Sequence, residues 1–204
     1  MSTQLVRRVK LTLNISRPCA SAIPHYRCLR GSVEGGLRMA RYAIETERDV
    51  CVIMRKRLVR TSSSNTLDVE REVHVYLPHV ASETDLVEDS LAQCLRKRYP
   101  LYALDVRGMG ESLTDVERGM FHPYGGEYMC HGYSLLLGES LLGRRVYDVL
   151  TTLDLLVHEG ARRVHLYGCG QGAILALFAG FLHPMTASVV LKNGPLSYHS
   201  WAQV

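Results

Sequence analysis

The stretch that decides the fold is VHLYGCGQGAILALFAGFL, residues 164–182. It begins as a short apolar strand, bends between Gly168 and Gly172, and continues as an apolar helical run. A strand, a sharp turn and a helix form a nucleophile elbow, whose usual sequence is G-x-S-x-G. Gly168 and Gly172 supply the two small flanking residues, but Gly170 stands at the nucleophile position. Because glycine has no side chain, it cannot attack a carbonyl carbon or hold a covalent intermediate.

Cys169 is an alternative nucleophile at the same bend. With Cys169 at the tip, the flanking positions would be Tyr167 and Gln171, which are bulky where neighbouring backbone must come close. We therefore expect Cys169 to be a small, buried or half-buried thiol beside the turn.

The composition is that of an ordinary globular domain. The chain has 204 residues, of which 47% are apolar and 22% are charged, and its formal net charge is +4. This length allows one domain with a sizeable core. Arginines are scattered rather than gathered into a basic stripe, which argues against nucleic-acid binding. Because no apolar run reaches the length of a membrane span, we expect no membrane association.

The six cysteines occur singly, without C-x-x-C pairs, and no histidine cluster has the spacing of zinc ligands. We therefore expect no metal site. Single cysteines within expected strands and helices are typical of reduced thiols, which favours a cytoplasmic protein. The N-terminal residues carry positive charge before an apolar patch that is too short for a secretory signal.

The N-terminal part of the chain is difficult to assign. Residues 1–35 are expected to form a poorly defined extension, and residues 36–204 the recognisable domain. The alternation from Val9 to Ile15 predicts a strand within the extension. Two further strands, over residues 39–45 and 50–54, are expected to be joined by a polar turn.

Strands and helices alternate in the rest of the chain. The sequence predicts strands over residues 72–77, 101–104, 163–167 and 188–191, and helices over residues 86–97, 140–159 and 173–182. Ser82 is the expected N-cap of the first of these helices, and a long irregular insertion is expected from Leu113 to Gly138. This alternation predicts an α/β fold with a mainly parallel sheet, helices on both faces and an antiparallel N-terminal edge.

Two motifs together resemble the α/β-hydrolase superfamily. The first, Asp105-x-Arg107-Gly108-x-Gly110-x-Ser112, looks like the loop D-x-R-G-x-G-x-S that follows a central strand, and the second is the elbow. The particular likeness is to the acetyl xylan esterase and cephalosporin deacetylase group. In that group the elbow is typically followed by Q-G-G and an Ala/Leu-rich helix that ends near a proline. The corresponding residues are Gly170-Gln171-Gly172-Ala173, Leu175-Ala176-Leu177 and His183-Pro184. The likeness covers about residues 70–195 and implies a three-layer sandwich.

This resemblance implies an oxyanion hole beside the elbow. The backbone N–H of Gln171 would be one donor, because it follows the nucleophile position and opens a helix. The second donor would come from the loop after strand 72–77, near His79 or Val80. His79 has the simpler alternative of being a surface histidine.

The same resemblance implies structural roles for nearby charges. Asp105 and Arg107 would form a charge pair that fixes the loop, which would turn at Gly108 and Gly110. Arg145 and Asp148 would form a pair along helix 140–159.

The chain departs from the superfamily in two ways. Gly170 replaces the nucleophilic serine, and the acid and histidine that follow the elbow in this superfamily have no counterpart after strand 188–191. We therefore expect a degenerate or truncated acetyl-esterase-like domain, a pseudoenzyme without a cofactor, whose ligand would be a small ester or carbohydrate ester. Strand 188–191 would be an exposed sheet edge, which suits a protein partner or self-association.

An active ester hydrolase is the first alternative. Its nucleophile would be Cys169 or Ser134, and its base would be His79, His122 or His131. Such catalysis requires the base to lie within hydrogen-bond reach of the nucleophile.

An NAD(P)-binding Rossmann-like domain is the second alternative. Gly168-x-Gly170-x-x-Ala173 fits the G-x-G-x-x-G/A pattern between a strand and a helix. Lys192 and Asn193 stand where an acidic ribose ligand is expected, and a lysine there would suit the 2′-phosphate of NADP.

Overall fold

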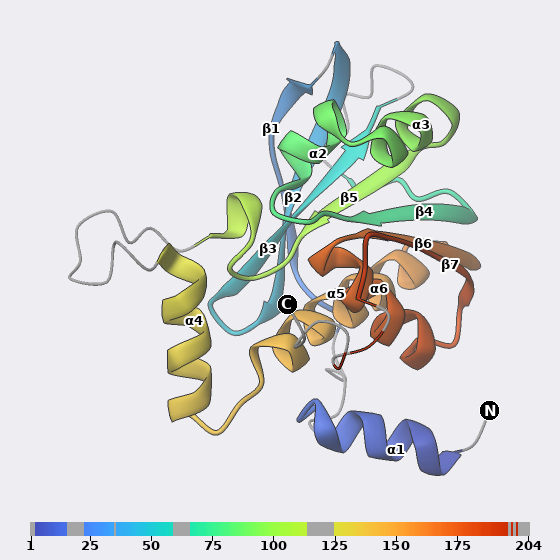
Figure 1. Ribbon diagram of the computed structural model, residues 1–204. Coiled ribbons are helices and arrows are strands. Elements are labelled where there is room, and N and C mark those ends of the chain that lie inside the picture. The colour runs from blue at the N-terminus through green and yellow to red at the C-terminus, as the bar shows by residue number, and fades with distance from the viewer. Residues whose placement is uncertain are drawn as a thin grey trace.

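A seven-stranded sheet organises the part of the chain that the computed structural model describes, namely residues 3–15, 23–34, 36–58, 66–113, 125–195, 197 and 199. The strand order is β1-β2-β3-β5-β4-β6-β7 (Figure 1). The strands are β1 Tyr26–Glu34, β2 Leu37–Glu47, β3 Val50–Arg57, β4 Glu72–Leu77, β5 Leu101–Asp105, β6 Arg163–Cys169 and β7 Thr186–Lys192.

The strand directions confirm the predicted sheet. β1, β2, β3 and β5 pair antiparallel in turn, whereas β5, β4, β6 and β7 pair parallel. Strands β2, β5, β4, β6 and β7 therefore run in one direction, and β1 and β3 run against them. The antiparallel part lies at the N-terminal edge, as predicted, and β1 belongs to it although it falls within residues 1–35.

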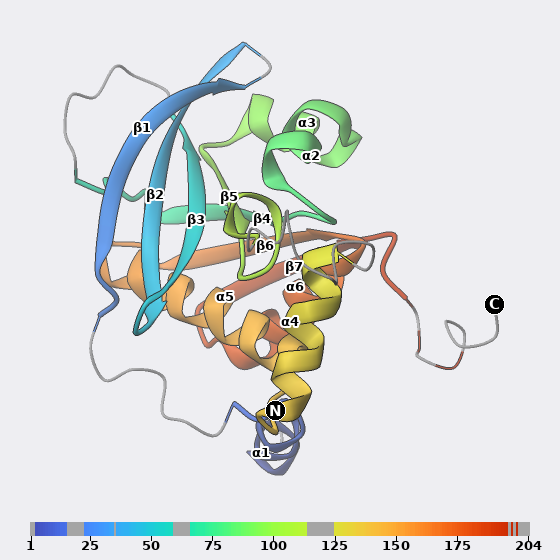
Figure 2. The same ribbon diagram turned by 90° about the vertical axis from the view of Figure 1, so that its left-hand side faces the viewer.

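Helices cover both faces of this sheet (Figure 2). α5 Leu141–His158 and α6 Gln171–Leu182 lie on one face, and α2 Ser82–Glu88 and α3 Ser90–Arg98 lie on the other. Apolar side chains are buried in each layer, Leu153 and Ala176 on the first face and Leu86 and Leu95 on the second. Two apolar layers separated by a sheet make the predicted three-layer sandwich.

The longest helix follows its sequence signals closely. Ser140 caps α5, because its Oγ accepts the N–H of Gly143 across 3.1 Å. Val146, Leu150 and Leu153 recur at helical spacing and are buried against the sheet. Gly143 has no room for a side chain, since a Cβ there would lie 2.8 Å from the carbonyl carbon of Leu13.

The predicted strand from Val9 to Ile15 is wrong. Residues Thr3–Thr12 form the helix α1, which contains no buried residue, and only Leu13 and Ile15 beyond it enter the core. The apolar residues Leu5, Val9 and Leu13 recur every four positions, which is a helical spacing. This short stretch therefore fits both the two-residue period of a strand and the 3.6-residue period of a helix.

Two further predictions need correction. The single helix over residues 86–97 is instead α2 and α3, and the Asp89 side chain caps α3 by accepting the N–H groups of Leu91 and Ala92. Ser82 lies inside α2, whose N-cap is Ala81. The insertion expected to be irregular contains the helix α4 Gly125–Leu136, which stands away from the sheet (Figure 1).

Candidate functional site

The elbow has the backbone that its glycines require. β6 ends at Cys169, Gly170 adopts φ 55° and ψ −115°, and α6 begins at Gln171. A Cβ on Gly168 would lie 2.6 Å from the Cα of Ala173, and a Cβ on Gly172 would lie 2.6 Å from the carbonyl oxygen of Pro78. Both glycines therefore allow close backbone approach, as the sequence predicts.

His79 occupies the space beside Gly170. A Cβ on Gly170 would overlap the imidazole ring, with the Cγ of His79 only 2.7 Å away. The ring also accepts a hydrogen bond at Nδ1 from the N–H of Gln171, across 3.2 Å. A histidine that accepts at Nδ1 carries no proton on that nitrogen. The side chain of His79 thus takes the place where a hydrolase projects its nucleophile.

The two expected oxyanion donors are both engaged. The N–H of Gln171 donates to the His79 ring, and the backbone N–H of His79 donates to Oδ2 of Asp85 across 2.9 Å. Val80 contributes its carbonyl, which accepts the N–H of Gly110 across 2.9 Å. In this conformation the backbone N–H groups of both Gln171 and His79 are already used, so neither is free for an oxyanion.

Asp85 holds the turn that carries His79. Its Oδ2 accepts both the N–H of His79 and the hydroxyl of Tyr76, each across 2.9 Å. Tyr76 is fully buried, and burial together with the Asp85 charge raises the pKa of its hydroxyl far above the usual range. The hydroxyl therefore stays a donor to Asp85, which fixes the turn against the sheet.

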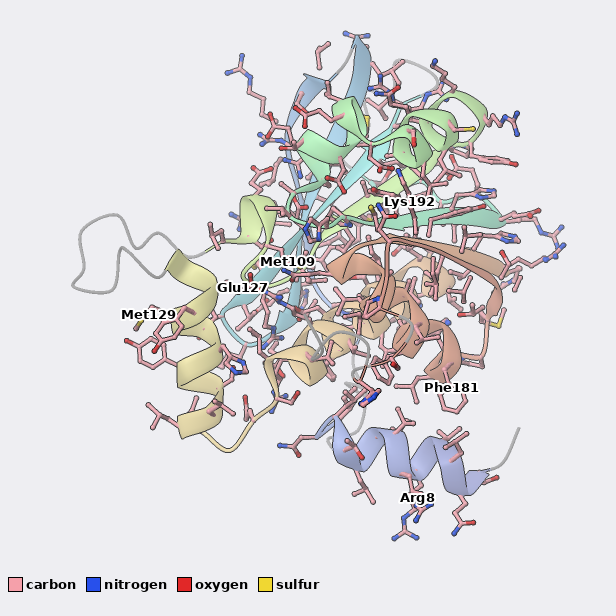
Figure 3. The ribbon with its side chains drawn as sticks, viewed as in Figure 1. Arg8, Met109, Glu127, Met129, Phe181 and Lys192 are labelled. Carbon is pink, nitrogen blue, oxygen red and sulfur yellow. The ribbon has the colours of Figure 1, made fainter. Side chains whose placement is uncertain are left out.

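Arg145 joins three parts of the site. Its Nη1 donates to Oε1 of Glu127 across 2.8 Å and to Oε1 of Gln171 across 3.1 Å, and its Nη2 donates to the carbonyl of Gly108. Glu127 points from α4 toward the body of the protein, whereas Met129 points away from it (Figure 3). Because the Arg145 side chain is almost fully buried, it connects α4, the elbow and the loop after β5 as one unit.

Asp105 pairs with a residue that the sequence argument did not include. Its Oδ2 accepts the Nη1 of Arg55 across 2.6 Å, and its Oδ1 accepts the backbone N–H of Ser82 across 2.7 Å. Burial raises the pKa of Asp105, which the Ser82 N–H and the Arg55 charge counteract in part. A Cβ on Gly110 would lie 2.6 Å from Oδ1 of Asp105, so this glycine makes room for the carboxylate.

Arg107 pairs with Asp148 instead of Asp105. Its Nη2 and Nε donate to the two carboxylate oxygens of Asp148 across 2.6 and 2.8 Å, and its Nη1 donates to Glu47 across 2.9 Å. Although burial lowers the pKa of Arg107, both carboxylates raise it above its usual value. The predicted Asp105–Arg107 and Arg145–Asp148 pairs are therefore wrong. The sequence gives only one indication that Arg55 pairs with a buried carboxylate: it is an arginine that directly follows the apolar strand residues 50–54.

A cavity of about 1060 Å³ opens beside the elbow. Its polar wall includes Gln171, His79 and Arg145, and its apolar wall includes Leu135 of α4 and Ile174 of α6. Pockets with apolar walls and a few convergent polar groups are the usual sites for small ligands. The cavity can therefore hold an apolar or amphipathic molecule against the N-terminus of α6.

Cys169 lies on the other side of the elbow from this cavity. Its thiol is buried and lies 3.7 Å from Oδ2 of Asp89, next to the apolar layer under α2 and α3. Burial and the charges of Asp89 and Asp85 raise the pKa of Cys169. A raised pKa reduces the thiolate fraction, which is the reactive form. The expected small, buried thiol beside the turn is confirmed.

The other catalytic candidates lie on α4 or outside the described residues. The hydroxyl of Ser134 donates to the carbonyl of Cys130 one helical turn earlier, across 2.8 Å. His131 lines the cavity together with His79. His122 lies outside the described residues. Ser134 thus makes a local helix contact, and no distance to an imidazole supports it as a nucleophile.

Two negative findings apply to the described part of the chain. Within it, no group of three or more His, Cys, Asp or Glu side chains is arranged to hold a metal ion. The helices described there include none that is long and apolar enough to cross a membrane.

Comparisons with known proteins give similar structures but no similar sequences. No protein-family model matches the chain, and no curated protein has a matching sequence. An acetyl xylan esterase 1 from Thermoanaerobacterium sp. is 16% identical with a TM-score of 0.62, over 100% of this chain and 67% of that one. A Bacteroides fragilis protein described as an acetyl xylan esterase is 15% identical with a TM-score of 0.63, over 91% and 52% of the two chains.

A third similar structure is an acetyl xylan esterase from Paenibacillus sp. R4, at 15% identity and a TM-score of 0.53, over 91% of this chain and 57% of that one. The chain thus spans between about half and two thirds of the length of these esterases. At such low identity the likeness concerns the fold. The resemblance inferred from the two motifs is confirmed at that level: the chain has the α/β-hydrolase-like fold of the acetyl xylan esterases.

Proposed function

We propose that this domain is a degenerate esterase-like domain, which binds a small carboxylic ester or carbohydrate ester without attacking it. The observation that carries the proposal is the position of His79. Its ring fills the space of the missing nucleophile side chain and takes the N–H of Gln171. Ester hydrolysis on this fold needs both an attacking atom at residue 170 and a free oxyanion donor.

The neighbouring cavity supports ligand binding. It combines an apolar wall with hydrogen-bonding groups at Gln171, His79 and His131. An ester has one carbonyl acceptor, which suits the polar wall, and an apolar acyl group, which suits the apolar wall. The esterase names of the similar structures agree with this ligand class.

The two alternatives have less support. For an active hydrolase, the raised pKa of Cys169 and the local bond of Ser134 leave both nucleophiles unactivated. For a dinucleotide site, the N–H of Gln171 would have to bind a pyrophosphate, but it donates to His79. Lys192, the candidate for a 2′-phosphate, pairs instead with Asp89.

We further propose a cytoplasmic setting. The thiols of Cys28, Cys51, Cys94 and Cys169 are free. Free thiols of this number are more usual in a reducing compartment than in a secreted protein.

An activity assay and a binding assay test the proposal together. With p-nitrophenyl acetate, we expect no saturable turnover by the wild-type chain. With an acetylated xylo-oligosaccharide in calorimetry, we expect saturable binding that Ile174→Trp weakens by filling the cavity. Leu177→Trp is the matched control, because Leu177 lies on the same helix and is half exposed.

Two results would overturn the proposal. Saturable turnover that Cys169→Ala or Ser134→Ala abolishes would show an active hydrolase with an unusual nucleophile. Equal binding by the wild-type chain and the Ile174→Trp variant would remove the cavity as the ligand site.

A further inference from the structure

The hydrogen bond that closes the elbow depends on a single ring nitrogen. His79 Nδ1 accepts the N–H of Gln171 across 3.2 Å, at the point where α6 begins. This nitrogen can accept only while it carries no proton. Imidazole is also the side chain whose charge ordinarily changes between about pH 5 and 8. The contact that keeps the N–H of Gln171 from a ligand is therefore one that a proton can break.

No reorientation of a protonated ring restores this contact. In the imidazolium both ring nitrogens are donors, so turning the ring about its Cβ–Cγ bond only exchanges an N–H for a C–H. The N-terminus of a helix also disfavours a positive charge, and Gln171 is the first residue of α6. The protonated ring is therefore expected to move away from the N–H of Gln171 and from the space beside Gly170 that it fills.

The backbone that carries the ring is held independently of it. The N–H of His79 donates to Oδ2 of Asp85, which also accepts the hydroxyl of Tyr76, each across 2.9 Å. Protonation of the imidazole removes neither of these bonds, because neither involves a ring nitrogen. The loop between β4 and α2 therefore keeps its place, and the movement is confined to the side chain of His79.

The charged and titratable groups around His79 differ in what a change of pH does to them. Asp85 of α2 holds its backbone N–H. The groups on the cavity wall are Glu127, His131, Glu139 and Arg145. Both of these glutamates are paired with arginines of α5. Carboxylates and guanidinium groups ordinarily keep their charge between about pH 6 and 8, so the two histidines are the members of this set that titrate in that range.

We propose that His79 is a proton-controlled gate: the neutral ring blocks the N–H of Gln171, and the protonated ring releases it to the carbonyl oxygen of an ester. This gate rests on the function proposed for the cavity and adds its regulation. Because only the neutral ring closes the site, the ester binds more tightly as the pH falls. One neutral hydrogen bond contributes little net of water, so the affinity should rise about threefold to tenfold. Gly170 offers no attacking atom, so the open site still does not hydrolyse the ester.

Calorimetry at about pH 6 and about pH 8 tests the gate, with a neutral acetylated xylo-oligosaccharide as the probe and circular dichroism to confirm the fold at both values. The probe does not titrate, so a pH-dependent affinity comes from the protein. The wild-type chain should bind more tightly at the lower pH. His79→Ala should bind equally well at both, because no ring closes the site. His131→Gln is the matched control: it removes the other histidine of the cavity wall and should keep the wild-type ratio of the two affinities.

The amide resonance of Gln171 in an isotope-labelled chain tests the gate without a ligand. It should shift with pH in step with the ring protons of His79, and the His79→Ala variant should lose this titration. Equal wild-type affinities at the two pH values, a wild-type ratio in His79→Ala, or a Gln171 amide that does not follow His79 would each overturn the gate. If no form binds the probe but the amide titration is intact, the proposed function is wrong and the gate stands.

Discussion

His79 Nδ1 accepts a hydrogen bond from the backbone N–H of Gln171, with 3.2 Å between the two nitrogens. In a working elbow this N–H stabilises the oxyanion, and a side chain on the preceding residue attacks the carbonyl. Here the preceding residue is Gly170, and the imidazole lies in the space of the absent side chain. One histidine thus contacts both the backbone N–H of Gln171 and the space beside Gly170, and this double contact is what the proposed non-catalytic function depends on.

Gly170→Ser should not restore esterase activity and should destabilise the fold. A serine there would have φ near 55°, which non-glycine residues rarely adopt, and such strain costs about 1–3 kcal/mol. It would also displace His79. The His79→Ala/Gly170→Ser double variant has no ring to displace. Its free energy of unfolding in urea should therefore be higher than that of Gly170→Ser alone.

Gly138→Ser is the matched control for this prediction. Gly138 also has a positive φ, 67°, but a Cβ there would meet nothing within 4 Å. Its unfolding free energy should fall by about 1–2 kcal/mol, from the backbone alone. Robust activity of the Gly170→Ser single variant would contradict the prediction, because it would show an acid and a base that the described residues do not reveal.

Gly172→Ala should be the most damaging change at the elbow. A Cβ on Gly172 would meet the backbone of Leu77 and Pro78, which cannot rotate away as a side chain can. Overpacking of this kind costs about 1–3 kcal/mol or more, measured as a fall in the free energy of unfolding. Gly132→Ala is the control: its Cβ would meet nothing within 4 Å, and alanine favours the helix by about 1 kcal/mol. Similar stability of both variants would refute the close packing.

The elbow could be predicted because its signals are local. Strand β6, the bend and helix α6 are consecutive, and Gly168 and Gly172 are where the backbone comes close. The strand predicted over Val9 to Ile15 was wrong because a local signal can also be ambiguous: a short apolar alternation fits both a strand and a helix. The sheet followed from the alternation of strands and helices, which restricts the possible topologies to a few.

The charge pairs could not be predicted, because each joins distant segments. Asp105 and Arg107 are two positions apart, and residues with this spacing would share a side only in a continuous strand; β5 ends at Asp105, so Arg107 lies in the loop that follows. Because the chain turns after β5, Asp105 pairs with Arg55 of β3 and Arg107 pairs with Asp148 of α5. The position of the His79 ring likewise depends on the turn held by Asp85, which no local pattern encodes.

Asp148→Ala should lower the free energy of unfolding by about 3–5 kcal/mol, the usual cost of leaving one partner of a buried ion pair alone. Asp148 is fully buried and accepts hydrogen bonds from both Arg107 and the hydroxyl of Thr46. Arg48→Ala is the control, because its pair with Asp49 is almost fully exposed and should contribute less than about 1 kcal/mol. Comparable losses in urea unfolding would contradict the role given to Asp148.

His74 should make the fold sensitive to mild acid. Its ring is buried, stacks on Tyr99 at 3.8 Å between ring centroids, and lies 4.9 Å from the ring of His165. Burial and the nearby His165 lower the pKa of His74, although Glu72 opposes this. The unfolded chain therefore binds a proton more readily than the folded one, so stability is complete above the unfolded pKa of about 6.5 and falls as the pH drops below it.

His74→Phe keeps a ring against Tyr99 but cannot take up a proton. It should reduce the loss of stability between neutral and mildly acidic pH, measured by urea unfolding at each pH. The lost contact between His74 Nδ1 and the Tyr167 hydroxyl, 3.0 Å long, should cost about 1 kcal/mol equally at every pH above that range. An unchanged slope of stability against pH in the variant would show that other groups cause the acid sensitivity, because the substitution removes the only proton that His74 can add.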